Sequence, residues 1–272
     1  MDRTSSASAT SALTDLSPAE VRARIRTGAY SGPTAGLARG YVQANFVALP
    51  LDWAGEFATF CERNRQACPV LATTQPGSTA VPELALDADL RTDIPSYLFY
   101  RAGKLDAEVP DIKALWRQDM VCFLLGCSFT FDHYLLAAGL PVRHIEQCLN
   151  VAMYRTSILT VATARLSGPL VVSMRPMPAQ QVERARQISA RFPDMHGAPV
   201  HTGDPTAIGI ADLARPDYGD AVMAQEGDVP MFWACGVTPQ AIAIASRVPF
   251  MITHAPGNMF LTDRQIAPAF FR

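Results

Sequence analysis

The sequence predicts a layered α/β fold. Segments typical of buried strands alternate with segments typical of amphipathic helices, and no internal repeat or linker separates them. Of the 272 residues, 49% are hydrophobic and 18% are charged, which is typical of a compact globular protein with a substantial core. We therefore expect residues 17–265 to form a single domain, with a disordered tail rich in Ser, Thr and Ala at residues 1–16 and a short C-terminal tail at residues 266–272.

The first predicted element is a helix that begins after Ser17. Ser17 and Glu20 form a capping box, Pro18 suits the first turn, and Gly28 ends the helix. The next segment is rich in glycine but lacks the spacing of a dinucleotide-binding loop. After it we expect, in chain order, a strand at 41–50, a helix capped by Asp52 with Trp53, Phe57 and Phe60 on one face, a surface loop at 72–90, and a hairpin at 96–110 that turns at Ala102-Gly103.

The second half of the chain continues this alternation. Two apolar helices are expected at 121–129 and 131–139, and Gly139 and Pro141 would end the second. The remaining expected elements are a strand at 168–178, a helix at 178–192, a strand at 229–236, a helix at 238–247 and a strand at 249–257.

Composition narrows the classes of partner. The formal net charge of −2 argues against nucleic acid and against an anionic membrane surface. The N-terminus lacks the apolar core of a secretory signal, and no apolar run is long enough to span a bilayer. The six cysteines include no C-x-x-C pair, which favours reduced thiols in a cytoplasm. We expect a cytoplasmic protein whose partners are a small-molecule acidic substrate and further copies of itself in a homo-oligomer.

The stretch FWACGVTPQAIA, residues 232–243, predicts a strand that runs through Cys235-Gly236 into a helix opened by Thr238. Free backbone N–H groups at such a turn, together with the helix dipole, can hold a carboxylate or a phosphate. Gly236 and Thr238 are therefore candidate substrate-binding residues, although Thr238 also suits an ordinary N-cap. Cys235 is a candidate nucleophile if the dipole lowers its pKa, and otherwise a small buried residue.

Side chains that could bind an acidic substrate are concentrated in residues 141–156, PVRHIEQCLNVAMYRT. Arg143, His144, Glu146 and Arg155 are interleaved there with apolar residues, so some of these polar groups should face inward and need partners. Guanidinium groups bind carboxylates at two points, which makes the arginines candidate clamps. Two more arginines elsewhere in the chain are candidates for the same role: Arg91 and Arg175.

Three histidines are candidates for substrate contact or proton transfer. His254 stands where a predicted strand gives way to a Pro-Gly turn, a common place for catalytic groups. His196 and His201 lie five residues apart in RFPDMHGAPVHTGDPTAIGI, residues 191–210, which is not the i, i+4 spacing of a helical zinc motif. With Asp204 they could hold a divalent metal if the loop folds back on itself. We favour proton transfer by His201 with Asp204 over a fixed metal site.

Seven blocks of the chain resemble the YcsI-like hydro-lyase family. In chain order they are SGPTAGLARGYVQANFVALP, DLRTDIPSY, PVRHIEQ, SGPLVVSMRP, FPDMHGAPVHTGDPTAIGIADLARPDYGD, FWACGVTPQ and THAPG. The resemblance covers nearly all of residues 17–265, and the domain of mammalian mitochondrial D-glutamate cyclase is similar. It implies a mixed three-layer α/β body with a smaller two-layer α/β lobe, which we place at about residues 140–200 of this chain.

The resemblance also implies a reaction. The similar enzyme converts D-glutamate to 5-oxo-D-proline and water and is helped by divalent cations. We therefore expect a carbon–oxygen lyase acting on a small amino or hydroxy acid, with Mg²⁺ or Mn²⁺ as the cation. The candidate roles are a carboxylate clamp at Arg143, Arg155 or Arg175 and at the helix opened by Thr238, proton transfer by His201 or His254, orientation of an imidazole by Glu146 or Asp204, and further substrate contacts at His144 and His196.

The chain departs from the family pattern at two places. It reads HIEQCLNVAMYRTSI where HIEQGxNVPMYxTNI is common, and APGNMF where APGHMF is common, so Asn258 stands in place of a histidine. The residues alone leave two other function classes open. A Cys235-dependent amide hydrolase would lose activity on thiol alkylation, with protection by substrate. A binding module for a small acidic metabolite would bind its ligand without changing it.

Overall fold

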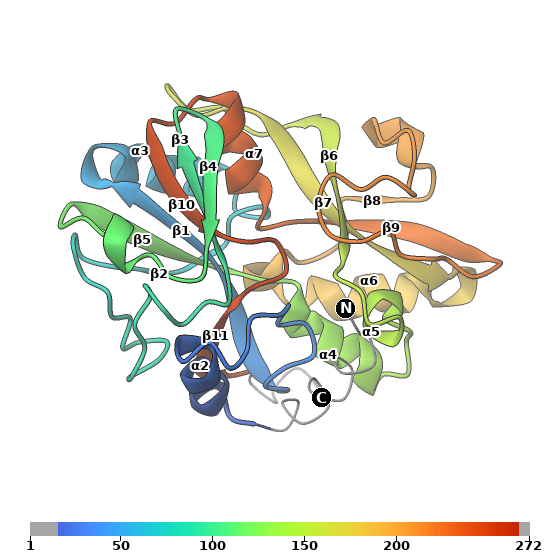
Figure 1. Cartoon of the computed structure of the whole chain (residues 1–272). Coiled ribbons are helices and arrows are strands. Elements are labelled where there is room, and N and C mark those ends of the chain that lie inside the picture. The colour runs from blue at the N-terminus through green and yellow to red at the C-terminus, as the bar shows by residue number, and fades with distance from the viewer. Residues whose placement is uncertain (1–15, 267–272) are drawn as a thin grey trace.

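The computed structural model describes residues 16–266, which form two antiparallel sheets (Figure 1). The larger sheet has seven strands in the order β2-β5-β1-β10-β3-β4, with β11 also paired to β1, and the smaller has four in the order β6-β7-β9-β8. The strands are β1 (Tyr41–Pro50), β2 (Val70–Thr73), β3 (Tyr97–Arg101), β4 (Lys104–Val109), β5 (Met120–Gly126), β6 (Ala152–Leu159), β7 (Pro169–Pro178), β8 (His201–Thr202), β9 (Asp228–Ala234), β10 (Phe250–His254) and β11 (Phe260–Gln265). The α-helices are α2 (Pro18–Arg26), α3 (Leu51–Arg63), α4 (Phe129–Ala137), α5 (Arg143–Glu146), α6 (Val182–Ala190) and α7 (Thr238–Ala245).

Strand β1 organises the larger sheet. It pairs with β5 in continuous register from Ala44 opposite Gly126 to Pro50 opposite Met120. On its other edge, β11 pairs with the first part of β1 and β10 pairs with the second part. The backbone of Phe46 therefore faces the gap between the end of β10 and the start of β11.

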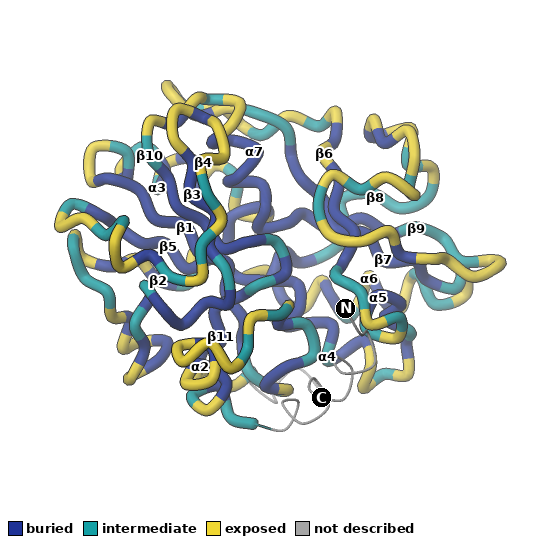
Figure 2. The backbone as a smooth tube through the Cα atoms, viewed as in Figure 1, coloured by how far each residue is buried: buried dark blue, intermediate teal, exposed yellow. Residues whose placement is uncertain are grey.

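One face of the larger sheet packs against α3 and against the smaller sheet. Phe57 and Phe60 of α3 are fully buried, and the Phe57 ring meets the ring of Phe123 on β5 edge-on, with 4.9 Å between centroids. The same core cluster includes Tyr154 and Val172 of the smaller sheet. The two sheets thus share one hydrophobic core, and Figure 2 shows buried backbone running through the interior strands of both.

Irregular chain, rather than a helix, covers much of the opposite face of the larger sheet. Val81, Leu84 and Leu90 from this segment are buried in a second core cluster with the side chains of β1, β3 and β5. The loop predicted at 72–90 is confirmed from residue 74 on, but it is more than a surface loop because its apolar side chains complete the core.

Helices α4 and α6 contribute to the core on one face of the smaller sheet. Trp233 of β9 is fully buried, and its ring centroid lies 5.6 Å from that of Phe131 on α4. Met177 of β7 and Ala185 of α6 belong to the same cluster. This packing brings the first turn of α4 against β7.

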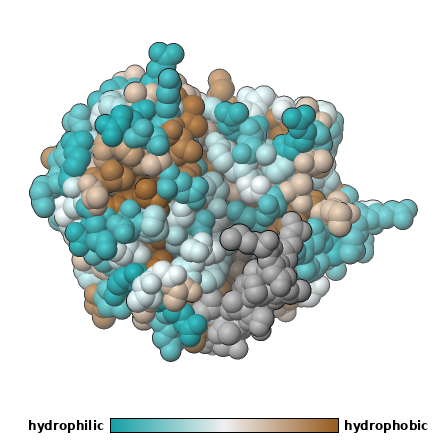
Figure 3. All heavy atoms as spheres, viewed as in Figure 1, coloured by the Kyte–Doolittle hydropathy of each residue, from teal (hydrophilic) through white to brown (hydrophobic). Residues whose placement is uncertain are grey.

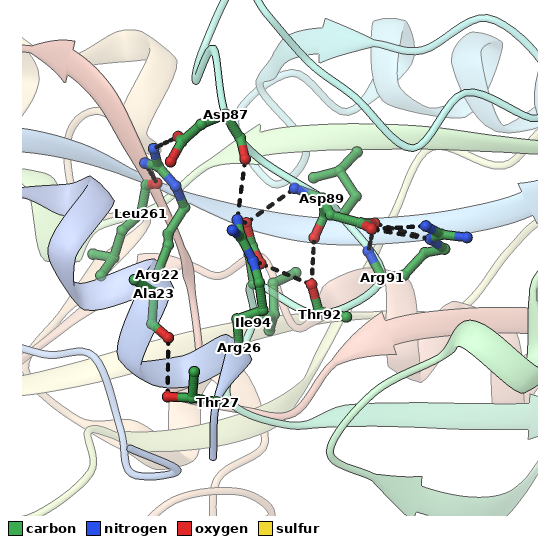
Figure 4. Close-up of polar contacts among 12 residues, drawn as sticks. Arg22, Ala23, Arg26, Thr27, Asp87, Asp89, Arg91, Thr92, Ile94 and Leu261 are labelled. Atoms are coloured by element: carbon green, nitrogen blue, oxygen red, sulfur yellow. Dashed lines mark hydrogen bonds and ion pairs between the residues drawn. The ribbon is translucent and has the colours of Figure 1, made fainter. Parts of the chain in front are cut away.

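Helix α2 is fastened to the larger sheet by two arginines (Figure 4). Arg22 is fully buried and donates to the carbonyl of Leu261 and to the carboxylate of Asp263, each at 2.8 Å, and it also pairs with Asp87. Arg26 pairs with the buried carboxylate of Asp93 at 2.6 Å. A helix near the start of the described chain is thereby tied to β11 and to the irregular segment that covers the core.

Most of the predicted elements are confirmed. Helix α2 has the predicted capping box, with Ser17 and Glu20 bonded to one another's backbone N–H. The strands at 41–50 and 168–178 and the hairpin at 96–110 are present, as are the helices within 178–192 and 238–247. The helix predicted at 131–139 is α4, which begins two residues earlier, at Phe129. The strands within 229–236 and 249–257 are present too.

The helix predicted at 121–129 is wrong, because this stretch is strand β5 up to Gly126. A short apolar run has the same pattern in a buried strand as in a buried helix, and here pairing with β1 and β2 on both edges decides. Asp52 was expected to cap the helix that follows β1. Helix α3 instead begins at Leu51, so Asp52 lies inside its first turn, and Pro50 at the N-cap position provides no side-chain hydrogen bond. Strands β2, β6, β8 and β11 were not predicted.

Hydrophilic and hydrophobic residues are mixed on the side of the molecule shown in Figure 3. Figure 3 shows hydrophilic residues spread over the viewed side, with hydrophobic residues mostly over the larger sheet. Exposed apolar side chains such as Leu86 and Leu105 are scattered, which is normal for a globular protein. Within residues 16–266, no helix has the length and apolar character needed to cross a membrane.

Candidate active site

A buried ion pair joins the first turn of α4 to the middle of β7. Asp132 and Arg175 are both almost fully buried, and Arg175 binds the carboxylate at two points, with Nε 2.6 Å from Oδ1 and Nη2 2.8 Å from Oδ2. Gly126 ends β5 just before α4, and the two intervening residues, Cys127 and Ser128, place the helix so that Asp132 points at β7.

The other contacts of Arg175 are also internal. Nη1 donates to Ser173 at 3.1 Å and Nη2 donates to Ser128 at 3.0 Å. The guanidinium carbon lies 5.1 Å from the ring centroid of Phe131 and 5.4 Å from that of Trp233. Arg175 was predicted to clamp a substrate carboxylate, and the structure places it instead around a carboxylate of the protein itself.

His144 completes this cluster. It is fully buried on α5, its ring is stacked with Phe129 at 5.9 Å, and its Nε2 lies 3.5 Å from Oδ2 of Asp132. Within the described chain, Nε2 has no hydrogen-bond partner. Burial lowers the pKa of His144 to about 4, with Asp132 raising it and Arg175 lowering it further. His144 is therefore a neutral imidazole at pH 7, with one ring nitrogen free beside a carboxylate.

A small cavity reaches this cluster from the surface. It has a volume of about 40 Å³ and lies between the glycine-rich segment 36–41 and helix α4. Gln43, Thr130 and Asp132 are its buried lining residues that carry polar side chains, and Arg39 is exposed at its edge. The full lining is Gly36, Leu37, Ala38, Arg39, Gly40, Tyr41, Gln43, Phe129, Thr130, Asp132, His133, Leu136 and Ile145.

The other candidate histidines hold backbone groups. His254 is fully buried, and its Nδ1 lies 3.1 Å from the backbone N and 3.2 Å from the carbonyl O of Phe46, in the gap between β10 and β11. The Nδ1 of His196 bonds to the carbonyl of Gln66 at 2.8 Å. Burial lowers the pKa of both to about 4. The Nε2 of His254 is buried and has no partner among the described residues, so this nitrogen resembles the free one of His144.

His201 contacts Asp204 through a backbone atom, not through the carboxylate that was expected to act with it. Nε2 of His201 lies 2.7 Å from the carbonyl oxygen of Asp204, while the Asp204 carboxylate accepts from the backbone N–H and hydroxyl of Thr206. These hydrogen bonds lower the pKa of the exposed Asp204 carboxyl. The opening turn of a 3₁₀ helix, Pro205–Ile208, is thereby capped.

The remaining charged candidates lie in ion pairs. Arg143 binds Asp228 at 3.1 Å and Glu146 at 3.1 Å. Exposed Arg155 pairs with Asp217 at 3.0 Å. Arg91 and Asp89 form a local two-point pair on the irregular segment (Figure 4). The structure brings none of these three arginines to the Asp132 cluster.

The start of α7 is filled by protein atoms. Thr238 is fully buried, and its hydroxyl donates to the carbonyl of Cys235 at 2.7 Å and accepts from the N–H of Val171 at 3.2 Å. A Cβ added at Gly236 would stand 2.1 Å from the side chain of Asn45, so Asn45 occupies the space beside this glycine. Burial raises the pKa of the Cys235 thiol to about 11, which keeps it protonated at pH 7.

The described residues contain no ready-made cluster of metal ligands. Within residues 16–266, no three His, Cys, Asp or Glu side chains gather closely enough to hold a metal ion. Since Mg²⁺ is commonly held by one or two carboxylates together with waters and substrate, the divalent cation expected from the resemblance stays a prediction.

Sequence reasoning missed Asp132, Gln43 and Asn45. Asp132 stands alone in the apolar helix FTFDHYLLA, and a lone carboxylate in an apolar helix needs a buried partner, which was the available signal. Asn258 lies at the turn after β10, where its amide and that of Asn150 both donate to the carbonyl of Pro256. The Oδ1 atoms of these two asparagines are buried and have no partner in the described part of the chain.

Comparison with known proteins gives the family. The profile of the D-glutamate cyclase family matches residues 121–263. A protein of Stutzerimonas stutzeri named "Putative hydro-lyase" is 58% identical over 252 residues, covering 93% of this chain and 95% of that protein. Two further proteins described as putative hydro-lyases are similar to this chain. The one from Bordetella pertussis is 57% identical over 244 residues, covering 90% of this chain and 88% of that protein. The one from Bacillus licheniformis is 55% identical over 251 residues, covering 92% of this chain and 96% of that protein.

Among solved structures, a nitrogen repressor-like protein from Methanococcus jannaschii has a TM-score of 0.36 and 10% identity, over 86% of this chain and 91% of that one. A similarity this low supports no conclusion, whereas the sequence relatives match over almost their whole length. The chain therefore belongs to the D-glutamate cyclase family, together with bacterial relatives that bear a hydro-lyase name.

Proposed function

We propose that this protein is a hydro-lyase acting on a small amino acid, with the conversion of D-glutamate to 5-oxo-D-proline and water as the leading reaction. Family membership supports the class of reaction. The observation that carries the proposal is the 3.5 Å approach of His144 Nε2 to Asp132 Oδ2, beside a cavity that reaches Asp132.

The reaction needs proton transfer and no outside reagent. The α-amine nitrogen attacks the γ-carboxyl carbon, a C–N bond forms, and one C–O bond breaks. The two protons that the α-ammonium group loses leave with that oxygen as water, so atoms and charges balance. A group that first accepts a proton from nitrogen and then returns it to oxygen therefore suffices.

Asp132 and His144 supply such a group in this proposal. Asp132 lines the cavity, where its negative charge attracts the ammonium end of the substrate. Neutral His144, beside the Asp132 carboxylate, takes up a proton only transiently, because burial disfavours its charged form. Its low pKa therefore favours quick return of the proton to the departing oxygen. Arg175 keeps the Asp132 carboxylate in place throughout.

A Cys235 hydrolase has less support, because the nucleophile must be a thiolate and burial keeps this thiol protonated. A non-catalytic binding module is the other alternative, and an assay for product distinguishes it from a lyase because a binding module leaves its ligand unchanged. Purified protein is incubated with D-glutamate, L-glutamate and related diacids, with and without Mg²⁺ or Mn²⁺, and the products are followed by NMR.

Three matched variants then locate the proton-transfer group: His144→Gln, His201→Gln and His254→Gln, each checked for folding by thermal melting. We expect His144→Gln to lower kcat by at least about a hundredfold with little change in KM. Near-wild-type kcat in folded His144→Gln would remove His144 from the mechanism. A selective loss in His201→Gln or His254→Gln would move the role there.

A further inference from the structure

Gln43 carries an amide that is satisfied on one side and bare on the other. The residue lies on β1 and is 3% exposed. Its Nε2 donates both protons to backbone carbonyls, to Thr34 at 3.0 Å and to Leu37 at 3.2 Å. Its Oε1 is buried and has no hydrogen-bond partner within residues 16–266.

The orientation of this amide is determined by its neighbours. Rotating the group by half a turn would place Oε1 against the carbonyl oxygens of Thr34 and Leu37, and two acceptors cannot bond to one another. Gln43 lines the cavity, and both protons of its amide nitrogen are already donated, so Oε1 is the amide atom that still lacks a partner beside it. A buried acceptor without a donor is costly, which indicates that a donor belongs at this position.

The surroundings of Gln43 select a positively charged donor. The hydroxyl oxygen of Thr130 already accepts from the backbone N–H of Gln43 at 3.2 Å. Asp132, the other buried polar group of the lining, is a carboxylate. The buried polar wall therefore presents the amide oxygen of Gln43 and the carboxylate of Asp132 as acceptors, with Arg175 behind the carboxylate and the Thr130 hydroxyl beside it. The charged or titratable groups on the outer part are Arg39, Tyr41 and His133, and burial, followed by the charge of Arg39, lowers the pKa of His133.

The size of the cavity limits what enters. A water molecule needs roughly 10–15 Å³ of such volume. The 40 Å³ here therefore accommodates one small polar group and its attached carbon, while the rest of a ligand stays in the mouth. An ammonium group fits both the volume and the acceptors, and a carboxylate at the mouth would meet Arg39.

We propose that Gln43 is a specificity-determining residue whose Oε1 accepts a hydrogen bond from the ammonium group of the substrate, beside the carboxylate of Asp132. The identity of the rest of the substrate rests on the proposed function. The contact itself is a matter of binding, so it is tested without turnover.

The experiment varies protein and ligand together. The dissociation constants of D-glutamate and of glutarate, which lacks the amine, are measured by calorimetry for the wild-type protein, for Gln43→Met, and for Gln187→Met as the control. Gln187 is exposed on α6, its amide donates to Glu183, and it is not among the residues that line the cavity, so its loss leaves the cavity unchanged. Thermal melting checks that each variant is folded, and NMR of each titrated sample checks that D-glutamate has not been converted during the measurement.

Wild-type protein is expected to bind D-glutamate more tightly than glutarate. Gln43→Met should weaken D-glutamate binding by roughly tenfold to a hundredfold, the usual cost of losing a hydrogen bond to a charged group. The same variant should change the dissociation constant of glutarate by less than about threefold, because a side chain of similar size leaves the packing of the cavity nearly unchanged. Gln187→Met should change the dissociation constant of neither ligand.

Equal weakening for both ligands would make Gln43 a purely structural residue and overturn the assignment. So would a wild-type protein that does not distinguish the two ligands. Should no diacid be turned over while the amine-dependent effect of Gln43→Met persists, the assignment stands and the proposed reaction fails. If D-glutamate is turned over but Gln43→Met weakens both ligands equally, the proposed reaction stands and the assignment of Gln43 fails.

Discussion

Arg175 holds both carboxylate oxygens of Asp132, at 2.6 and 2.8 Å, between a helix and a strand 43 residues apart in sequence. Both side chains are removed from water, so neither charge has solvent to compensate it. Coulomb attraction and two hydrogen bonds offset that desolvation only while the pair is intact.

Removing one partner of this pair should therefore be costly. We expect Arg175→Met to lower the free energy of unfolding by about 3–5 kcal/mol, because Asp132 is left buried and unpaired. The double variant Arg175→Met with Asp132→Leu should recover much of the loss. Urea denaturation of all three proteins measures this, and a double variant as unstable as the single one would contradict it.

Three buried histidines should make stability depend on pH. Burial lowers the pKa of His144, His196 and His254 to about 4 in the folded chain, against about 6.5 when unfolded. The unfolded chain therefore binds more protons between these values, so stability is fully present above pH 6.5 and is lost as the pH falls towards 4. Each histidine contributes on the order of 3 kcal/mol over that window.

The variant His144→Phe tests this dependence, since its ring can remain stacked with Phe129. Denaturation is measured at several pH values between 7 and 4.5. The slope of the unfolding free energy against pH should be smaller than in the wild type, by an amount that corresponds to the uptake of about one proton on unfolding. An unchanged slope would show that His144 does not keep its low pKa in the folded protein.

Two glycines should tolerate no side chain. A Cβ at Gly126 would stand 1.6 Å from the carbonyl oxygen of Asp194, and one at Gly236 would stand 2.1 Å from Asn45. Asn45 cannot easily move aside, because its Nδ2 donates to the carbonyl of Gly126 at 2.6 Å. Gly126→Ala and Gly236→Ala should each lower the melting temperature.

Gly55 provides the matched control for both variants. It lies in α3 with nothing within 4 Å of an added Cβ. Gly55→Ala should stabilise the protein by about 0.5–1 kcal/mol, because alanine has less freedom to lose in a helix. Melting temperatures that fall equally in all three variants would contradict the packing argument.

Thiol reactivity should be confined to one position. Cys148 is exposed, whereas Cys61, Cys68, Cys122, Cys127 and Cys235 are buried. Burial also raises the pKa of Cys235 to about 11. Alkylation of the native protein at pH 7.5, followed by mass spectrometry, should modify one thiol per chain rapidly, and the variant Cys148→Ser should abolish that step. Rapid modification of Cys235 would revive the hydrolase alternative.

The predictions from sequence succeeded where structure is decided locally. The capping box of Ser17 and Glu20 and the turn at Ala102-Gly103 involve residues within a few positions of one another, and both are present. Residues 121–126 failed because a short apolar run does not distinguish a strand from a helix, and only the neighbouring strands β1 and β2 make it a strand.

The candidate site was predicted less well. His144 was predicted as one of several polar residues interleaved with apolar ones, but its neighbour Asp132 was missed, although a lone carboxylate in the apolar helix α4 needs a buried partner. Gln43 lies in a strand whose other residues are nearly all buried, and its bare Oε1 depends on where Thr34 and Leu37 present their carbonyls.

The sequence by itself determined the family, through its seven matching blocks, and it determined the α/β class and the place of most helices and turns, because these follow from periodicity and contacts between near neighbours. The tertiary structure alone decided which polar groups are paired and which are left free. Arg175 forms an ion pair with Asp132. Nε2 of His144 and Oε1 of Gln43 have no hydrogen-bond partner in the described part of the chain. Burial and pairing depend on segments far apart in the chain, and these meet only when the two sheets pack around one core.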